Sequence, residues 1–244
     1  FADWDFRGTS QQEFDHLIGI FHELEQPVYI ADYEHLGVYA CRILVPGMSD
    51  IYPVEDLLLA NNTMGAHLRE VILALPSLEW NAEQYMALFD QLDEEGHDER
   101  TRVRELLGIA AAKGSALHTL RIGELKAMLA LAAGDLESAL DLIDWTMEFN
   151  QSVFPADRAN YYRALRACVE LFLDEERDPE QYRPVFARMF GEETLAEAWA
   201  HARGEARFHG LEAADLSLSQ FPLHQKLLAA YEKLQKAKRA HSWA

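Results

Sequence analysis

Two short apolar segments near the start of the chain constrain its fold more than any other feature. Residues 28–50 have the pattern of two β-strands joined by a short turn and closed by a Pro-Gly corner. The second strand, residues 38–45, is apolar on both alternating faces except at Arg42. Such a strand is typical of the interior of a covered sheet, yet a two-stranded hairpin is only marginally stable alone. We therefore expect the chain, which begins without an initiator Met, to be the C-terminal fragment of a larger protein.

An amphipathic helix is predicted before the strands. Ser10 and Glu13 have the spacing of a capping box, and Pro27 ends the helix. Its apolar face consists of Phe14, Leu17, Ile18, Phe21 and Leu24. One helix and two strands make a small α/β unit, which we assign to residues 1–62 as the edge of an α/β domain. Residues 51–62 are predicted to be a connector.

Residues 63–244 have the patterns of a helical domain. Asn81 with Gln84, and Asp178 with Pro179, mark predicted helix starts. Gly134 and Asp135 separate two amphipathic segments, and so short a connection predicts an antiparallel helical hairpin. We expect the centre of its core to be formed by Leu125, Leu129, Leu140 and Ile143.

The predicted helical segments also show signs of an internal sequence repeat. Residues 133–140 resemble the turn of a tetratricopeptide repeat, in which a small Ala lets the second helix pack closely. A further helix begins at Tyr161, about 40 residues after Leu120, which is a plausible repeat period. The predicted fold class is therefore mainly α, with a tetratricopeptide-like helical domain following a small α/β remnant.

The last helix combines an apolar stripe with many cations. Leu227, Tyr231 and Leu234 are predicted to face the core, and the basic residues are Lys226, Lys233, Lys236, Lys238 and Arg239. Cations suit a helix C-terminus because of the macrodipole. We favour a solvated basic face. Contact with an acidic patch of a sister subunit is the alternative.

Charge and cysteine content bound the partners and the compartment. The net charge of −19 argues against direct nucleic-acid binding, which needs clustered Lys and Arg. Cys41 and Cys168 lie far apart in apolar runs, so we expect two buried thiols and a reducing compartment. We see neither a signal-peptide pattern nor an apolar stretch of membrane-spanning length. These features favour a cytoplasmic protein without a membrane segment.

No catalytic constellation emerges from the sequence. His22 and Glu23 do not extend to a zinc-protease motif, because position 26 is Gln. The carboxylate-rich run at residues 92–99 lacks the ligand spacing of a calcium loop, and we expect a solvated helix end there. A metal hydrolase has only the scattered His16, His22, His35 and His67 in its support. We assign no catalytic, cofactor-binding or metal-binding residue.

Several longer segments resemble the C-terminal part of a bacterial YcaO protein. The matching segments include Tyr52-Pro53, residues 60–62, 93–96, 102–108, 119–130, 145–150 and 159–163. The resemblance runs from Asp3 to Gln235, and so covers essentially the whole chain. It is to a subgroup with a tetratricopeptide-like C-terminus rather than a proline-rich tail.

The resemblance implies a function for the whole protein. YcaO proteins use ATP and magnesium to phosphorylate an amide oxygen, so that a nucleophile can attack the carbonyl. The subgroup is linked to β-methylthiolation of an aspartate in a small-subunit ribosomal protein, as an accessory factor to a methylthiotransferase. The family's Glu-rich ATP motifs precede the hairpin and match nothing here, so no nucleotide-binding residue is carried over. Arg42, Pro46 and Gly47 match a family segment, for which we expect a fold role only.

Two functional hypotheses follow. In the first, the chain is a fragment of an ATP-dependent enzyme, inactive alone, that serves dimerisation or partner docking. In the second, it is a free-standing helical-repeat adaptor without enzymatic activity. The doubly apolar strand favours the first. Five aromatic residues support a homodimer through the helical domain, because they exceed what two short helices need for their own contact: Trp145, Phe149, Phe154, Tyr161 and Tyr162.

Overall fold

The computed structural model describes residues 8–34, 37, 39–45, 48, 49, 65–150 and 153–240. The predicted connector, His35 and the Pro46-Gly47 corner lie outside these residues. The chain divides into two compact units. Unit 1 comprises Phe1–Asn61 and Leu227–Ala244, and unit 2 comprises Asn62–Lys226. Each unit is described by itself.

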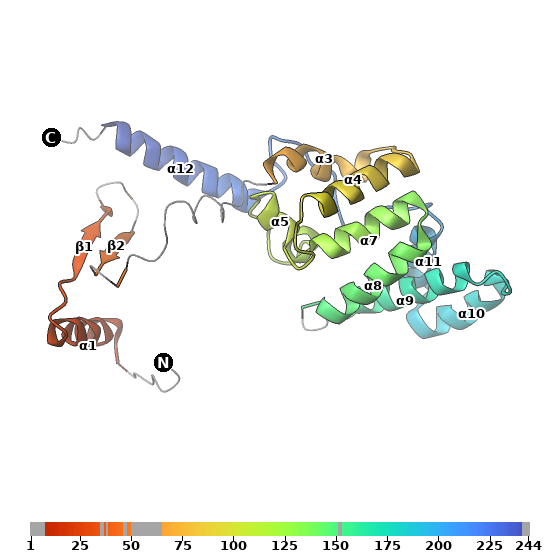
Figure 1. Ribbon diagram of the computed structural model, residues 1–244, viewed down its shortest axis with the longest axis horizontal. Helices are drawn as coiled ribbons and strands as arrows, with labels where there is room; N and C mark the ends of the chain where they lie inside the picture. The colour runs from red at the N-terminus through yellow and green to blue at the C-terminus, as the bar shows by residue number, and fades with distance from the viewer. Residues whose placement is uncertain are drawn as a thin grey trace. The chain divides into compact units, whose positions relative to one another are not determined.

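The described residues are mainly helical, as predicted (Figure 1). Unit 1 contains α1 (Ser10–Glu23), β1 (Tyr29–Asp32), β2 (Cys41–Leu44) and most of α12 (Pro222–Ala240). Unit 2 contains η2 (Ala66–Leu68), α3 (Arg69–Ala74), η3 (Leu75–Ser77), α4 (Ala82–Glu94), α5 (Val103–Leu106), α6 (Ala116–Thr119), α7 (Ile122–Ala133), α8 (Leu136–Asn150), α9 (Ala156–Leu173), α10 (Pro179–Phe190) and α11 (Glu192–Ala202). No helix of the described chain is both long and apolar enough to cross a bilayer.

The first helix begins one residue earlier than the sequence pattern indicates. Thr9 is the N-cap of α1, and its hydroxyl accepts a hydrogen bond from the Gln12 backbone N–H. Gln12 returns the contact, because its Oε1 accepts from the Thr9 N–H at 2.9 Å. The predicted Ser10–Glu13 capping box is therefore wrong, since both pairs have the required spacing and Thr9 holds the extended backbone of a cap.

The hairpin of unit 1 is exposed on both faces. β1 and β2 pair antiparallel, with Ile30 opposite Ile43 and Ala31 opposite Arg42. Ile30 and Ile43 are 49% and 50% exposed, and no residue of α1 is buried. β2 is shorter than the predicted strand over residues 38–45, and of that strand's described residues only Val45, just after β2, is buried.

The C-terminal helix also leaves its apolar side exposed. Leu227 and Tyr231 are 45% and 60% exposed, so the prediction that they face a core is wrong. Helical periodicity identifies an apolar stripe but does not show what covers it. Within unit 1, the Lys233 Nζ donates a 2.9 Å hydrogen bond to the Gly37 carbonyl oxygen.

Helix α7 is the central element of unit 2. Ten of its twelve residues are buried, as expected for a helix that is apolar nearly all round. Leu125 and Leu129 belong to one core cluster, with residues of α3 and α4, whereas Ala127 and Ala130 belong to a second, with residues of α8, α9 and α11. Figure 1 shows α7 between α4 and α8.

The hairpin of α7 and α8 is confirmed. Gly134 ends α7 with a left-handed backbone at φ 80°, which a side chain would strain. The Asp135 carboxylate accepts from the Ser138 N–H at 3.1 Å and so begins α8. Leu125, Leu129 and Ile143 are fully buried as predicted, but Leu140 is only partly buried at the edge of the second cluster.

Candidate functional site

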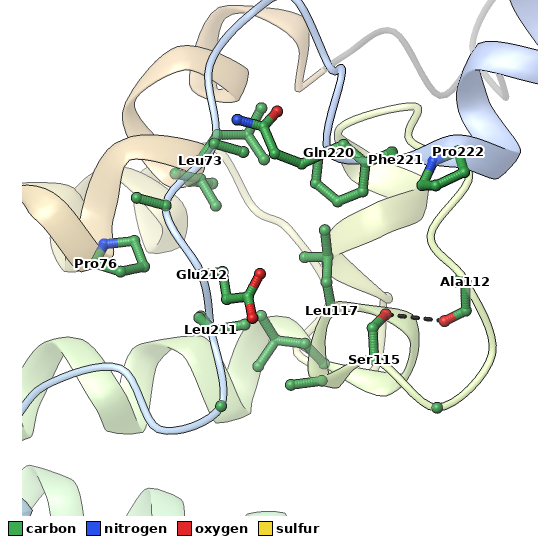
Figure 2. Close-up of a pocket in the computed structure, with 17 residues that line it drawn as sticks. Leu73, Pro76, Ala112, Ser115, Leu117, Leu211, Glu212, Gln220, Phe221 and Pro222 are labelled. Atoms are coloured by element: carbon green, nitrogen blue, oxygen red, sulfur yellow. Dashed lines mark hydrogen bonds between the residues drawn. The ribbon is translucent and has the colours of Figure 1, made fainter.

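A pocket of about 300 Å³ opens on unit 2 between three chain segments (Figure 2). They are residues 72–76 at the end of α3, residues 112–120 around α6, and residues 210–222. The last segment is held to α3 by a 2.8 Å hydrogen bond from the Ala214 N–H to the Leu73 carbonyl oxygen. The segment that leads into α12 thus forms one wall of the pocket, and the end of α3 with the residues around α6 forms the other.

The interior of this pocket is largely apolar. Leu73, Leu117, Leu211 and Phe221 line it, and Figure 2 shows the Glu212 carboxylate between Leu117 and Leu211. Within the described chain Glu212 has no hydrogen-bond or ion-pair partner. An apolar hollow with one free carboxylate suits an apolar group that carries a neighbouring cation or donor.

The polar side chains of the pocket do not form a catalytic arrangement. The Ser115 hydroxyl donates to the Ala112 carbonyl oxygen at 2.9 Å, and no hydrogen bond joins it to a His or a carboxylate in the part of the chain that is described. A nucleophilic serine needs a base within hydrogen-bond reach. The described polar groups of this pocket therefore include no activated serine.

A second polar cluster lies inside unit 2. The Oε1 of Glu124 accepts a 2.6 Å hydrogen bond from the Tyr162 hydroxyl and a further bond from the Arg158 Nη2. The Arg158 Nη1 donates to the Thr119 hydroxyl at 2.8 Å, and its guanidinium lies over the Phe154 ring. Burial raises the pKa of Glu124, and the adjacent Arg158 opposes that rise.

This cluster joins helices rather than contacting ligands. Glu124 has no exposed surface, so a molecule in solution cannot reach it. Glu124 Oε2 and Arg158 Nε find no partner among the described residues. The sequence analysis missed this pair, although a Glu and a Lys within the apolar run 122–131 were a usable signal, because such charges are rarely buried without partners.

The acidic run at residues 92–99 contains the end of α4 and is mostly exposed, as predicted, but several of its carboxylates have partners. The Nζ of the buried Lys126 donates to Asp93 at 2.6 Å and to Glu99 at 2.9 Å. Glu95 accepts from His67 and His97 at 2.8 Å each, and also from Gln91. Burial acts to raise the pKa of Glu95, but these hydrogen bonds outweigh it and lower that pKa to about 2.

Another group of titratable side chains packs between α9 and α11. The His209 ring stacks on Tyr161 with the centroids 3.5 Å apart, and its Nδ1 lies 2.7 Å from the Glu197 carboxylate. Burial lowers the pKa of His209. No three metal-ligating side chains come together anywhere in residues 8–34, 65–150 or 153–240 or in the short described stretches between them. His16 and His22 lie on α1, and His67 in η2 is bonded to Glu95.

The two cysteines differ in environment. Cys168 is fully buried in the second core cluster, and burial raises its pKa to about 12. Cys41 is exposed on β2, so the prediction of two buried thiols is wrong for Cys41. Its apolar neighbours in sequence lie on a hairpin that the described residues leave uncovered.

Comparison with known families identifies the chain. Residues 65–240 match the model of the YcaO cyclodehydratase C-terminal domain. The chain belongs to the YcaO cyclodehydratase family. Residues 1–49 match a second YcaO cyclodehydratase model, described as ATP- and Mg²⁺-binding. The resemblance predicted from the sequence is thus confirmed in both units.

Two relatives match nearly the whole chain. It is 60% identical over 244 residues to the ribosomal protein S12 methylthiotransferase accessory factor YcaO of Escherichia coli strain K12, covering 100% of this chain and 42% of that protein. It is 53% identical over 240 residues to a protein described as uncharacterized from Haemophilus influenzae, covering 98% of this chain and 41% of that protein. The chain therefore spans about two fifths of the length of these YcaO relatives.

The described residues of unit 1 do not fit a Mg-ATP site by themselves. A magnesium site needs converging carboxylate or phosphate oxygens, and the described part of unit 1 brings no three metal-ligating side chains together. Arg42 is exposed on β2 opposite Ala31.

Proposed function

We propose that this chain forms the C-terminal part of an ATP-dependent, amide-activating YcaO protein, and that its helical unit docks a protein partner or a second copy. The observation that carries the docking role is the apolar pocket with the free Glu212. It lies on a unit with its own core, in which the described residues form no nucleophile–base pair. The alternative, an adaptor without enzymatic activity, shares this docking role and differs only in lacking the rest of an ATP-binding domain.

The proposed process is β-methylthiolation of an aspartate in a small-subunit ribosomal protein. The name of the Escherichia coli relative, an accessory factor for the ribosomal protein S12 methylthiotransferase, supports it. The proposed partner is accordingly the methylthiotransferase or the ribosomal protein. Helix pairs closed by tight turns, as in α7 and α8, are typical of tetratricopeptide-like docking domains, and we propose that unit 2 works as one.

Binding to these two proteins tests the docking role. We expect the full 244-residue chain to bind one of them in calorimetry. Leu211→Glu in the pocket should weaken that binding at least about tenfold, as for a central apolar contact. Leu216→Glu is the matched control, because Leu216 is already 54% exposed and does not line the pocket. Equal affinities of the two variants would contradict a role of this pocket, and no binding to either protein would contradict the proposed partners.

Nucleotide binding is expected to need residues outside this chain. The net charge of −19 repels a polyanion unless a metal site compensates. Calorimetric titration with Mg-ATP should therefore show no binding tighter than about 100 μM, which corresponds to roughly −5.5 kcal/mol. Tighter binding would overturn the assignment of no cofactor to the chain itself.

A homodimer through unit 2 is the second form of docking that we propose. Tyr161 and Tyr162 are buried within the unit and are not available for it. Phe154 is stacked on the Tyr162 ring with the centroids 5.3 Å apart. Trp145 and Phe149 remain: their rings lie 4.9 Å apart on α8, and Phe149 is 37% exposed. Light scattering should show a dimer that strengthens modestly with salt, because added salt screens the repulsion between acidic copies. Phe149→Glu should yield a monomer, and a wild-type monomer at micromolar concentration would contradict this form of docking.

A further inference from the structure

A groove of about 550 Å³ runs between α8, α9 and α10 of unit 2. Its apolar floor contains Leu140 of α8, Ala167 and Leu173 of α9, and Tyr182 and Phe186 of α10. None of these five side chains is completely buried. The α8–α10 groove shares no lining residue with the pocket of Figure 2.

The α8 side of the α8–α10 groove is acidic, through carboxylates that lie beside the groove rather than in its lining. Helix α8 has no Lys or Arg, and its carboxylates at positions 137, 141, 144 and 148 are all exposed. Their spacing of four, three and four residues places them along one side of the helix, next to Leu140. Glu137, Asp141 and Glu148 have no hydrogen-bond or ion-pair partner in the described part of the chain.

Two arginines close to the groove are already neutralised. The Arg166 guanidinium donates to Asp144 and forms a 2.7 Å ion pair with Glu170. The Arg177 Nε lies 2.8 Å from the Asp174 carboxylate. The free charges on the α8 side of the groove are therefore negative and complement a basic ligand, whereas on α9 the exposed Arg163 has no ion-pair partner among the described residues.

We infer that the α8–α10 groove binds a basic amphipathic helix of a protein partner. An apolar groove between helices accepts the apolar face of such a helix, whose residues project at i, i+3, i+4 and i+7. Lysines and arginines on its flanks would then lie against Glu137 and Asp141. This inference rests on the proposed docking role and adds a second surface and the chemistry of its ligand.

The helix α12 of a second copy is the competing occupant, because it too is basic and amphipathic. We commit to a different protein, since residues of α12 from Leu227 onward belong to unit 1 and Lys233 is bonded there to Gly37. The two occupants are distinguished by testing α12 itself as a ligand.

The probe is a synthetic helical peptide with leucines at i, i+3, i+4 and i+7 and lysines elsewhere. Fluorescence anisotropy with the full chain should show it binding at least about tenfold tighter than a scrambled peptide of the same composition, because only the first forms an apolar face. A peptide of residues 222–240 should bind more weakly than the designed one. Equal binding of scrambled and designed peptides would overturn the groove, and tighter binding of the 222–240 peptide would overturn the choice of a foreign partner.

Two matched pairs of variants locate the binding surface. Ala167→Leu fills the floor and should weaken binding at least about tenfold, whereas Ala196→Leu, exposed on α11 outside the groove, should not. Glu137→Gln with Asp141→Asn should weaken binding about threefold to tenfold at low salt. Asp90→Asn with Glu94→Gln removes the same charge from α4, which does not line the groove, and should have a smaller effect. Thermal melting checks that all variants fold.

The outcomes separate this inference from the proposed function. Suppose that the chain binds the methylthiotransferase or the ribosomal protein, but that Ala167→Leu does not change the affinity for the peptide. The chain then docks partners, but not through this groove. Groove-dependent peptide binding without binding of either protein supports the groove and overturns the proposed partners.

Discussion

Glu124 and Arg158 form an ion pair that joins α7 to α9 inside unit 2. Glu124 belongs to the helix that both core clusters share, and Arg158 lies in the first turn of α9. Tyr162, one turn further along α9, donates to the same carboxylate oxygen. Three polar side chains thus fix the register of two helices whose remaining contacts are mostly apolar and less directional.

Removal of the cation from this pair should destabilise the folded chain strongly. Arg158→Met leaves a buried carboxylate without its partner, and we expect a loss of about 3–5 kcal/mol in the free energy of unfolding, measured in urea. Adding Glu124→Gln should restore part of the loss, because Gln is neutral and still accepts from Tyr162. A double variant as unstable as the sum of the single variants would contradict the pairing.

The Arg158→Met variant should also become less stable as pH rises. Burial raises the pKa of Glu124, and without Arg158 no positive charge opposes that rise. The folded state then holds a proton that the unfolded state releases above its ordinary carboxyl pKa, so stability falls with increasing pH. Urea titrations at pH 5 and pH 8 check the sign, and Glu124→Gln should abolish the difference.

Glu95 should have the opposite pH dependence. Its pKa is lowered to about 2 by hydrogen bonds from His67, Gln91 and His97, which outweigh the effect of burial. The stability that it contributes is therefore present above the ordinary carboxyl pKa and is lost as pH falls from about 4.5 towards 2. Glu95→Gln should cost about 1 kcal/mol at pH 7, since the site is partly exposed to solvent. The difference in the free energy of unfolding between wild type and Glu95→Gln should be smaller at pH 3.5. A larger difference at pH 3.5 would contradict the lowered pKa of Glu95.

Gly123 should not tolerate alanine, although alanine favours helices. A methyl group there would lie 2.5 Å from Cζ3 of Trp145, which packs α8 against α7. We expect Gly123→Ala to cost about 1–3 kcal/mol through overpacking, and Trp145→Phe to relieve part of it. Gly19→Ala on α1 is the control, because it meets nothing within 4 Å and should be neutral or slightly stabilising.

The two thiols should react at very different rates. Cys41 is exposed, whereas Cys168 is buried with its pKa raised to about 12, and the thiolate is the reactive form. A colourimetric thiol reagent should modify one cysteine rapidly in the folded chain and both in denaturant. Cys41→Ser should remove the rapid phase, and a rapid phase that persists would contradict the exposure of Cys41.

Truncation to alanine at different positions of the α7–α8 hairpin should cost different amounts of stability. Leu129 is fully buried, and Leu129→Ala should lose about 2–5 kcal/mol. Leu140 is only partly buried and lines the α8–α10 groove, so Leu140→Ala should lose about 1 kcal/mol, below the range for complete burial. Equal losses in chemical denaturation would contradict the exposure of Leu140.

Local features of the fold were predictable from the sequence. The cap at Asn81, the turn at Gly134 and the helix start at Asp178 each depend on a few adjacent residues. Periodicity also placed Leu125, Leu129 and Ile143 in the core. It failed at Cys41 and at the stripe of α12, because a periodic pattern shows an apolar face but not whether another element covers it.

The candidate sites were not predictable in the same way. The pocket of Figure 2 is built from three segments, and the first and last of them, residues 72–76 and 210–222, are more than a hundred residues apart in the sequence. No local pattern links Leu73 to Leu211 or Phe221. Glu124 and Arg158 are separated by 34 positions. Only the charges themselves, in the apolar sequence of α7, indicated that partners had to come from elsewhere.

The two-stranded sheet of unit 1 has consequences for any work with this chain in solution. Among the described residues β1 and β2 pair only with each other, so each strand is an edge whose outer N–H and C=O groups are available for a strand from another molecule. Strand addition would be insensitive to Phe149→Glu and would build open-ended species rather than closed pairs. An average mass that keeps growing with concentration would therefore indicate association through this sheet. An average mass that stops at that of a dimer would indicate association through the helices of unit 2.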